Sequence, residues 1–590
     1  MKKTNIKKLL TTAGAIALAL VMLLTFGGCA AIRNFIDRII DGYQPYNIPT
    51  VKFSDMEYER PEIDALTADV QKLIEKVKGG TANTSYDDVV QELYNVNLTL
   101  ANWLSMQSLA FIHYSIDTTD EKWVAETAYF DGASDDYMQT VEALYVACAQ
   151  SEFKAKLEEN FFGSGTLDPY VNGPIITDEV AALMQREAEL KSEFAAFDYT
   201  KLTFSFEGKE GTIDVHAATV SYDDIDRYNA LIDALYEAIN EAAAPILIEM
   251  VKVRKDIARL SGYNSYAEYA YETALYRDYT PAQAGALADE ILKKIGPMYI
   301  SASSSGLMDV FYSDGSTRMS AGQVLDSLEK FASLLGDKFA EAFDYMEKYE
   351  LYYFGYGSEQ LDNSLTTYIP NYYAPFTLIK GTGTVADLVT FAHEFGHFTD
   401  SYVNYTSNND LDLSEIASTS LQYLLMDRAG DLGLSESARQ SIVNYQKSST
   451  VDIYVTQSLY YLFESQLYEL SDSELTVENV NALARSIVKD YGLDETDVGQ
   501  SLAMIWPSIY HFYEQPFYTI SYVNADFASI QIYDKELEKK GSGIELYLKL
   551  IVWDRSMSFT ENLERVGLDT PFSEGAVDRL ADNIRKVLEQ

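Results

Sequence analysis

The chain contains a histidine, a glutamate directly after it and a second histidine three residues further on: His393, Glu394 and His397. The surrounding segment, 385–403, has apolar residues at helical spacing, and residues four apart on a helix project from the same face. Two imidazoles on one face can bind one zinc ion, while the glutamate, one step round the helix, can act as general base toward a metal-bound water. The motif therefore predicts a zinc-dependent hydrolase.

The same pattern has a plainer interpretation, which is a pair of core histidines beside a solvated glutamate. Only five histidines are present in 590 residues, so a chance match to the motif is on the order of one in a few hundred. Two of the other histidines, His113 and His216, stand far from the motif in sequence, and we expect both to be structural or surface residues. The metal-binding interpretation is therefore favoured.

A catalytic zinc ion commonly has three protein ligands and a water molecule, so a third donor is needed. The third histidine of metzincins is absent, because Val403 stands at its position. Asp400 lies on the same helical face as His393, but about 10 Å along the helix axis, which is too far for a shared ion. We expect Asp400 either to orient His397 or to face solvent.

A glutamate further along the chain is the better candidate for the third ligand. Glu415 stands near the start of a second amphipathic helical pattern, 413–430, which follows a polar loop. A helix packed across the first one would bring this carboxylate to the imidazoles of His393 and His397. Glu415 lies 18 positions after His397, and this placement resembles that of the third-ligand glutamate in gluzincin peptidases. We therefore expect one Zn²⁺ per chain, bound by these three residues.

Several motifs extend this resemblance to one family. HEFGH (393–397) followed by EIAST (415–419) resembles the M3 family of oligoendopeptidases, the relatives of thimet oligopeptidase and oligoendopeptidase F. RKDIARLSGYNSYAEYAYETALYRDYTPAQ (254–283) and HFYEQPFYTISY (511–522) are similar to an upstream segment and to the C-terminal active-site stretch of those enzymes. The resemblance covers roughly residues 200–590. It implies a mainly α-helical ellipsoid with a deep substrate channel, a single zinc ion at its base and cleavage of short unstructured peptides.

The resemblance also implies roles for three residues near the C-terminus. His511 matches the histidine that contacts the substrate in the family, and Tyr518 and Tyr522 fall where tyrosines stabilise the oxyanion. The chain has 45 tyrosines, so without the resemblance these two would be interpreted as packing residues. Together with Glu394, these three residues form the expected catalytic set.

The chain departs from the family pattern at two positions. Relatives often have a histidine where Asp400 stands, and often a glutamate where Gln422 stands, seven residues after Glu415. An uncharged amide can orient a ligand histidine without raising its basicity. We therefore expect Asp400 and Gln422 to support the ligands from behind, with a metal affinity or pH optimum that differs from that of the relatives.

The rest of the sequence predicts the elements that position these residues. Successive helical patterns predict an N-terminal helical region over 61–200, followed by an M3-like catalytic region over 201–590. Alternating apolar residues around two glycines predict a β-hairpin within 201–215. The aromatic and β-branched segment 349–383 predicts a small β-sheet beside the active-site helix. A free edge on the strand near 374–380 could hold an extended peptide by backbone pairing, and an ordinary sheet without a ligand is the alternative.

The composition places limits on the class of protein. With 47% hydrophobic and 23% charged residues the chain matches a folded soluble body, and a multi-span membrane protein is not indicated. A formal net charge of −45 repels nucleic acid, so we expect no nucleic-acid partner. Cys29 and Cys148 are the only cysteines, which excludes a disulfide framework, and we expect Cys148 to be a core residue. No obligate protein partner is evident.

The first residues have the three-part pattern of a secretory signal. Lysines up to Lys8 precede an apolar run over 9–26, and Gly27-Gly28-Cys29 follows. Small residues directly before a cysteine resemble a bacterial lipoprotein processing site. We therefore expect removal of residues 1–28, a lipid anchor on Cys29 at the outer face of a bacterial membrane, and a tether over 29–60. The alternative is an uncleaved signal-anchor helix, and the body lies outside the cytoplasm under either interpretation.

These observations predict a secreted, membrane-anchored zinc endopeptidase that hydrolyses short unstructured oligopeptides. A gluzincin aminopeptidase is one alternative. An exported peptide-binding lipoprotein with a structural zinc ion, and no catalysis, is another. The intact Glu394 argues against the last of these, because binding a peptide requires no general base.

The anchor prediction can be tested at Cys29. The variant Cys29→Ser should leave the membrane fraction with unchanged specific activity, because the anchored residue is remote in sequence from the metal-binding motif. The measurement is peptidase activity and protein amount in the soluble and membrane fractions. A variant that stays with the membrane would favour the signal-anchor helix.

Overall fold

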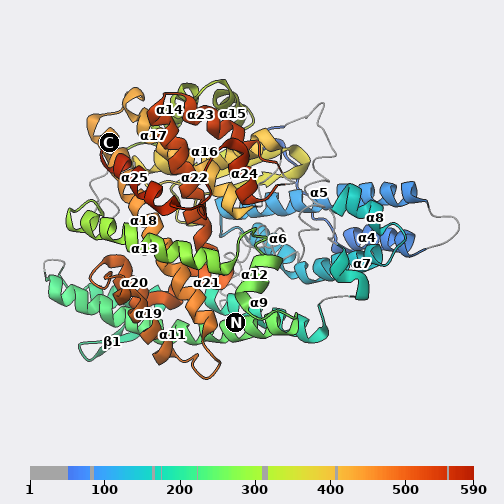
Figure 1. The fold of residues 1–590 in the computed structure, drawn as a ribbon, viewed down its shortest axis with the longest axis horizontal. Helices are drawn as coiled ribbons and strands as arrows, with labels where there is room; N and C mark the ends of the chain where they lie inside the picture. The colour runs from blue at the N-terminus through green and yellow to red at the C-terminus, as the bar shows by residue number, and fades with distance from the viewer. Residues whose placement is uncertain are drawn as a thin grey trace.

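The computed structural model describes residues 51–79, 85–162, 167–173, 176–221, 224–308, 317–405, 410–554 and 557–590. Helices account for most of these residues, as Figure 1 shows, which confirms the predicted mainly α-helical class. The predicted signal peptide, Cys29 and the tether up to residue 50 lie outside the described residues. Within the described ranges, no helix combines the length and the apolar character that crossing a membrane requires.

An N-terminal group of helices precedes the first strand. Its members are α4 (Ile63–Lys78), α5 (Tyr86–Ile116), α6 (Glu121–Gly132), α7 (Ser134–Ala149), α8 (Lys154–Leu157) and α9 (Asp178–Ala195). α4 packs against α5 and α7, and in Figure 1 these helices project from one side of the body. The long helix α5 joins this projection to the body, because Ser108 in its C-terminal half donates a hydrogen bond of 2.8 Å to the carbonyl of Tyr368.

The predicted β-hairpin is present as β1 (Phe204–Phe206) and β2 (Lys209–Gly211), paired antiparallel. Glu207 and Gly208 connect the strands, both with positive φ, which is the geometry of a tight two-residue hairpin turn. His216 is buried against this hairpin, and its Nε2 lies 3.1 Å from the carbonyl oxygen of Phe204. The structural role expected for His216 is thereby confirmed.

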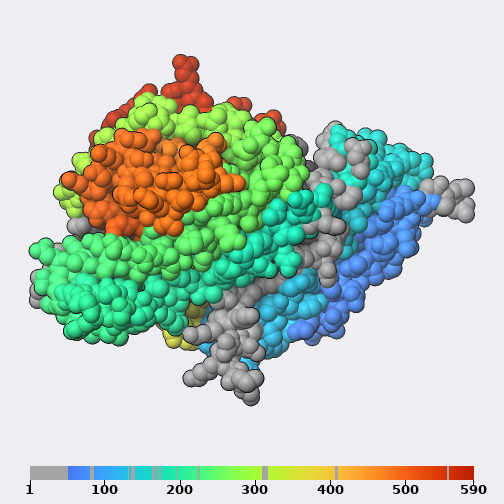
Figure 2. Space-filling model, turned by 90° about the horizontal axis from the view of Figure 1, so that it is seen from below, coloured from blue at the N-terminus to red at the C-terminus, as the bar shows by residue number. Residues whose placement is uncertain are grey.

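A second group of helices lies between the hairpin and the sheet. Its members are α10 (Ile213–Ala217), α11 (Ile225–Leu260), α12 (Tyr266–Thr273), α13 (Pro281–Ser304), α14 (Ala321–Leu335) and α15 (Asp337–Lys348). α13 and α14 begin with capping boxes at Thr280 and Ser320. Figure 2 shows residues of the C-terminal half, in orange, lying beside residues coloured green. α11 contacts α19 and α20.

A three-stranded sheet lies beside the helix that carries the motif, as predicted. Its strands are β3 (Tyr352–Gly355), β4 (Leu365–Ile369) and β5 (Ala374–Lys380), in the order β3-β5-β4. β5 pairs parallel with β3 and antiparallel with β4, and it packs against α16 (Ala386–Asn404).

The expectation of a free edge on strand 374–380 is wrong, because β5 is the central strand and its backbone is paired on both sides. Six of its seven residues are buried, as in a strand covered on both faces. The edge of β4 is also engaged at Tyr368, whose carbonyl accepts the hydrogen bond from Ser108 of α5. Which strand is central depends on the crossover between β3 and β5, which the pattern within one strand does not show.

The remaining helices complete the body around α16. They are α17 (Leu411–Arg428), α18 (Glu436–Glu469), α19 (Val477–Asp490), α20 (Asp497–Ile505), α21 (Tyr510–Glu514), α22 (Thr519–Glu538), α23 (Ser542–Ile551), α24 (Phe559–Val566) and α25 (Ala576–Leu588). α17 packs on α16 and on α22, so these three helices form successive layers behind the sheet. Cys148 is fully buried in the N-terminal group, which confirms it as a core residue.

Candidate metal centre

The helices α16 and α17 cross at Gly396, the residue directly before the second motif histidine. A Cβ atom at this position would lie 2.4 Å from the carbonyl oxygen of Ala417 and 2.5 Å from the Cα of Ser418. Such distances are far inside van der Waals contact, so only glycine permits this approach of the two backbones. The approach brings Glu415, on the first turns of α17, over the face of α16 that carries both motif histidines.

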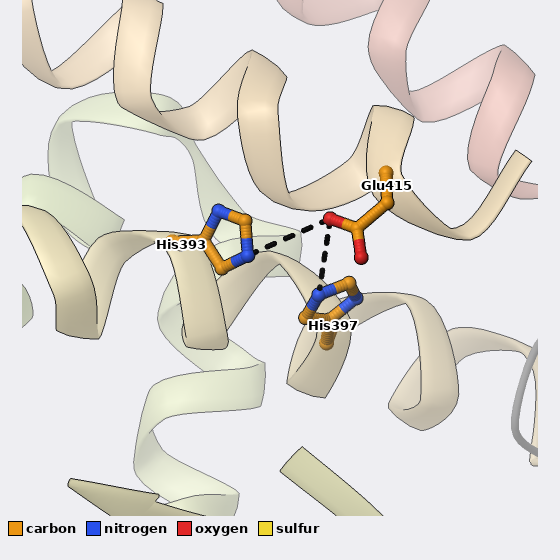
Figure 3. A group of neighbouring side chains, drawn as sticks. All are labelled: His393, His397 and Glu415. Carbon is orange, nitrogen blue, oxygen red and sulfur yellow. Dashed lines mark ion pairs between the residues drawn. The ribbon is translucent and has the colours of Figure 1, made fainter. Parts of the chain in front are cut away.

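The predicted ligands converge in this crossing. Figure 3 shows His393 and His397 projecting from one helix toward the carboxylate of Glu415 on the other. Glu415 Oε2 lies 3.6 Å from His393 Nε2 and 3.7 Å from His397 Nε2, and the potential donor atoms all lie within 4.8 Å of one another. Ligands bound to zinc at about 2.1 Å in tetrahedral geometry are separated by about 3.4 Å. The spacing and chemistry of this set therefore fit a metal ion.

The charge state of these groups also suits a cation. Burial by itself raises the pKa of Glu415, but His397, His393 and hydrogen bonds from Ser418 and Tyr518 hold this pKa below its ordinary value. The Glu415 side chain is therefore ionised near neutral pH. Burial lowers the pKa of His397, which favours the neutral imidazole that a metal requires.

The expected general base lies beside these donors. Glu394 is 6% exposed, on the same turn of α16 as His393. Its Oε2 accepts a hydrogen bond of 2.9 Å from the hydroxyl of Thr366, on β4. A residue of the sheet therefore holds the Glu394 carboxylate. The spacing of the motif did not predict this contact with Thr366.

The two residues expected to support the ligands lie on the same two helices. Asp400 is 3% exposed and accepts a hydrogen bond of 2.7 Å from Asn404, which also donates to the carbonyl of Ile551. The alternative that Asp400 faces solvent is therefore wrong. Gln422 lies two turns after Glu415 on α17 and is partly exposed. The supporting roles of Asp400 and Gln422 stay predictions.

The C-terminal residues join the same centre. The ring of His511 lies 5.2 Å from that of Tyr518 and 5.7 Å from that of Tyr522, measured between centroids. The Tyr518 hydroxyl donates a hydrogen bond of 3.2 Å to Glu415 Oε1, so this segment touches the ligand set directly. Burial lowers the pKa of His511 to about 4, and its ring is therefore neutral near pH 7. A neutral imidazole can donate a hydrogen bond but brings no positive charge.

A strained turn just before Tyr518 fixes the position of this segment. Phe517 has φ +63°, which a non-glycine residue rarely adopts. Its N–H donates to Glu464 Oε2 at 2.8 Å, and its carbonyl accepts from Arg277 Nη2 at 2.9 Å. Both sides of the Phe517 backbone are therefore held by buried side chains, Glu464 on α18 and Arg277 on the segment after α12.

A second buried arginine holds the residues that follow His511. Arg254 of α11 is 0% exposed and donates to the carbonyls of Phe512, at 2.6 Å, and Tyr513, while its Nε donates to Glu187 at 2.8 Å. The sequence resemblance covered the segment with Arg254 and Arg277 but gave neither a role. An arginine on the apolar stripe of a helix is the signal that could have identified Arg254.

Comparisons with known proteins match two parts of the chain to one peptidase family. A family model described as the Peptidase M3 N-terminal domain matches residues 53–164, and one described as Peptidase family M3 matches residues 323–582. An oligoendopeptidase F homolog of Borreliella burgdorferi strain B31 is 24% identical over 198 residues. That stretch covers 32% of this chain, and the chain spans 33% of the length of this curated relative.

Two solved structures share the fold along most of the chain. PZ peptidase A with an inhibitor is 24% identical, with a TM-score of 0.73, and the match covers 91% of this chain and 99% of the other. A structure provisionally assigned to oligoendopeptidase F is 23% identical, with a TM-score of 0.74, and covers 92% and 99%. At these identities the likeness shows the fold alone.

The role of the helix crossing can be tested with Gly396→Ala. The added methyl group would force α16 and α17 apart, so we expect at least about tenfold weaker zinc binding and a loss of stability of about 1–3 kcal/mol. The measurements are zinc content after dialysis against a metal buffer and thermal unfolding.

A matched control is Gly285→Ala, inside α13, where an added Cβ meets no atom within 4 Å. This variant should keep its zinc and gain up to about 1 kcal/mol of stability, the usual preference of a helix for alanine. If Gly396→Ala bound zinc like the wild type, the crossing would not be what sets the ligand geometry.

Proposed function

The chain belongs to peptidase family M3, and from this premise we propose that it is a zinc-dependent endopeptidase acting on short unstructured oligopeptides. The observation that carries the proposal is the convergence of His393, His397 and Glu415 around one point, with Glu394 on the same turn of α16 as His393. A peptide-binding protein with a structural ion would need the ligands but not the carboxylate beside them.

The residues of the site divide the proposed reaction between them. Zinc held by the three ligands would lower the pKa of a bound water and polarise the scissile carbonyl. Glu394 accepts the proton of the attacking water and passes it to the leaving amine. The family resemblance implies that His511, Tyr518 and Tyr522 would donate hydrogen bonds to the developing oxyanion, a contribution typically of about 2.7–4 kcal/mol per donor.

We also propose that the enzyme is exported and anchored through Cys29 to the outer face of a bacterial membrane. The lysine-rich start, the apolar run and the small residues before Cys29 support this location. The strongly negative charge of the chain suits a soluble body in an exposed compartment and no nucleic-acid partner.

The metal and the base can be separated by mutation. Glu394→Gln keeps the size and polarity of the side chain but removes the base, so zinc should stay near one ion per chain while turnover falls at least about 100-fold. His393→Ala and Glu415→Ala should lose zinc as well as turnover, because two protein ligands hold zinc poorly. Zinc content by elemental analysis and hydrolysis of a fluorogenic peptide distinguish these results. Full zinc and full activity in Glu415→Ala would show that the third ligand is misassigned.

The substrate class can be tested with two kinds of peptide and a folded protein. Glu394 is buried and the His397 side chain is only 18% exposed, so a scissile bond must reach them on an extended chain. Short unstructured peptides with a blocked N-terminus should be cut internally, while folded proteins resist. Mass spectrometry of the digests, with and without a chelator, makes the measurement. Cleavage that requires a free N-terminus would instead indicate an aminopeptidase.

A further inference from the structure

The general base is held by a side chain from the sheet. Thr366, on β4, has its hydroxyl oxygen 2.9 Å from Glu394 Oε2 and 3.1 Å from the backbone oxygen of Glu394. The same hydroxyl lies 3.0 Å from that of Thr377, the fully buried residue paired with it on β5. Glu394 therefore contacts a rigid, hydrogen-bonded element that is separate from its own helix.

Counting protons assigns the direction of these bonds. A threonine hydroxyl has one proton, and both Glu394 atoms near it are acceptors when the carboxyl is ionised. The bond to the carboxylate is the shorter one and is assisted by charge, so the proton points to Oε2. The hydroxyl of Thr377 then donates to Thr366, which orients and polarises it. Thr377 thus donates a hydrogen bond to Thr366, and Thr366 donates one to the carboxylate of Glu394.

We propose that Thr366 is a positioning residue for the general base, an inference that rests on the proposed peptidase function. Its hydroxyl fixes Oε2 of Glu394 and leaves Oε1 as the oxygen that accepts the proton of the attacking water. A glutamate side chain on a helix has several rotamers, and a general base must be within hydrogen-bond reach of its proton. The bond from the sheet selects one rotamer before the substrate arrives.

The test compares Thr366→Val with Thr366→Ser. Valine has the shape of threonine without the hydroxyl, so we expect kcat to fall about 10- to 100-fold, as for a small misplacement of a catalytic group, with KM and zinc content unchanged. Serine restores the donor and should recover most of the activity. A purely structural role would lower the melting temperature in both variants and would not be rescued by serine.

A double-mutant cycle shows whether the effect passes through Glu394. In a Glu394→Gln background, Thr366→Val should cause little further loss, because the group that it positions is already disabled. Equal losses in the two backgrounds would overturn the proposal. Thr367→Val is the matched control, since Thr367 is the next residue on β4 and its side chain lies on the opposite face of the sheet. This control should keep wild-type kcat.

Peptide cleavage by the wild type and by Thr366→Val distinguishes a failure of the positioning role from a failure of the proposed function. A wild-type chain that cleaves peptides in a zinc-dependent way, together with a fully active Thr366→Val, would overturn the role of Thr366 and leave the peptidase assignment standing. A wild-type chain that binds zinc but cleaves no peptide would overturn the proposed function and the positioning role with it. A crystal structure of Thr366→Val should show the Glu394 carboxylate in a changed rotamer.

Discussion

The approach of two helix backbones at Gly396 is the constraint on which the candidate metal centre depends. A glycine inside a helix costs about 0.5–1 kcal/mol relative to alanine, and here it lets α17 lie directly on α16. The other face of α17 carries small residues too, since Thr419 and Ser420 hydrogen-bond to Ser529 of α22 at 2.6 and 3.0 Å. Small side chains on both faces hold α17 close to both neighbours, so Glu415 has little freedom to move away from the histidines.

A network of buried charges links this layer to the C-terminal segment. Asp412, in the first turn of α17, accepts hydrogen bonds from Tyr279 at 2.9 Å and from Asn524 at 3.2 Å, and lies 3.7 Å from Arg277. Arg277 also holds the carbonyl of Phe517, so one guanidinium contacts both the helix of Glu415 and the turn before Tyr518. Removing one member of such a set leaves a buried charge without its partner, which costs several kcal/mol. The network therefore couples the position of Glu415 to the position of the segment that carries Tyr518 and Tyr522.

Local patterns predicted the parts of this site that lie within one element. The helical spacing of His393 and His397 placed both on one face, and alternation with two glycines predicted the hairpin at 204–211. Glu415 and His511 required a family resemblance, because they come from other helices, and no periodicity relates their positions to the motif.

Contacts between distant elements could not be predicted from such patterns. The bond from Thr366 to Glu394 depends on the register of β4 against β5 and on β5 being the central strand. Gly396 lies within the motif, but the need for glycine there comes from the contact with α17, a helix that begins fifteen residues later.

The functional role of Tyr518 is a second feature that the sequence could not predict. Its one proton is donated to Glu415 here, so the oxyanion role implied by the resemblance requires that bond to give way as charge develops on the substrate. The resemblance in sequence cannot reveal this competition, because it arises only from the distance between Glu415 on α17 and Tyr518, which directly precedes α22.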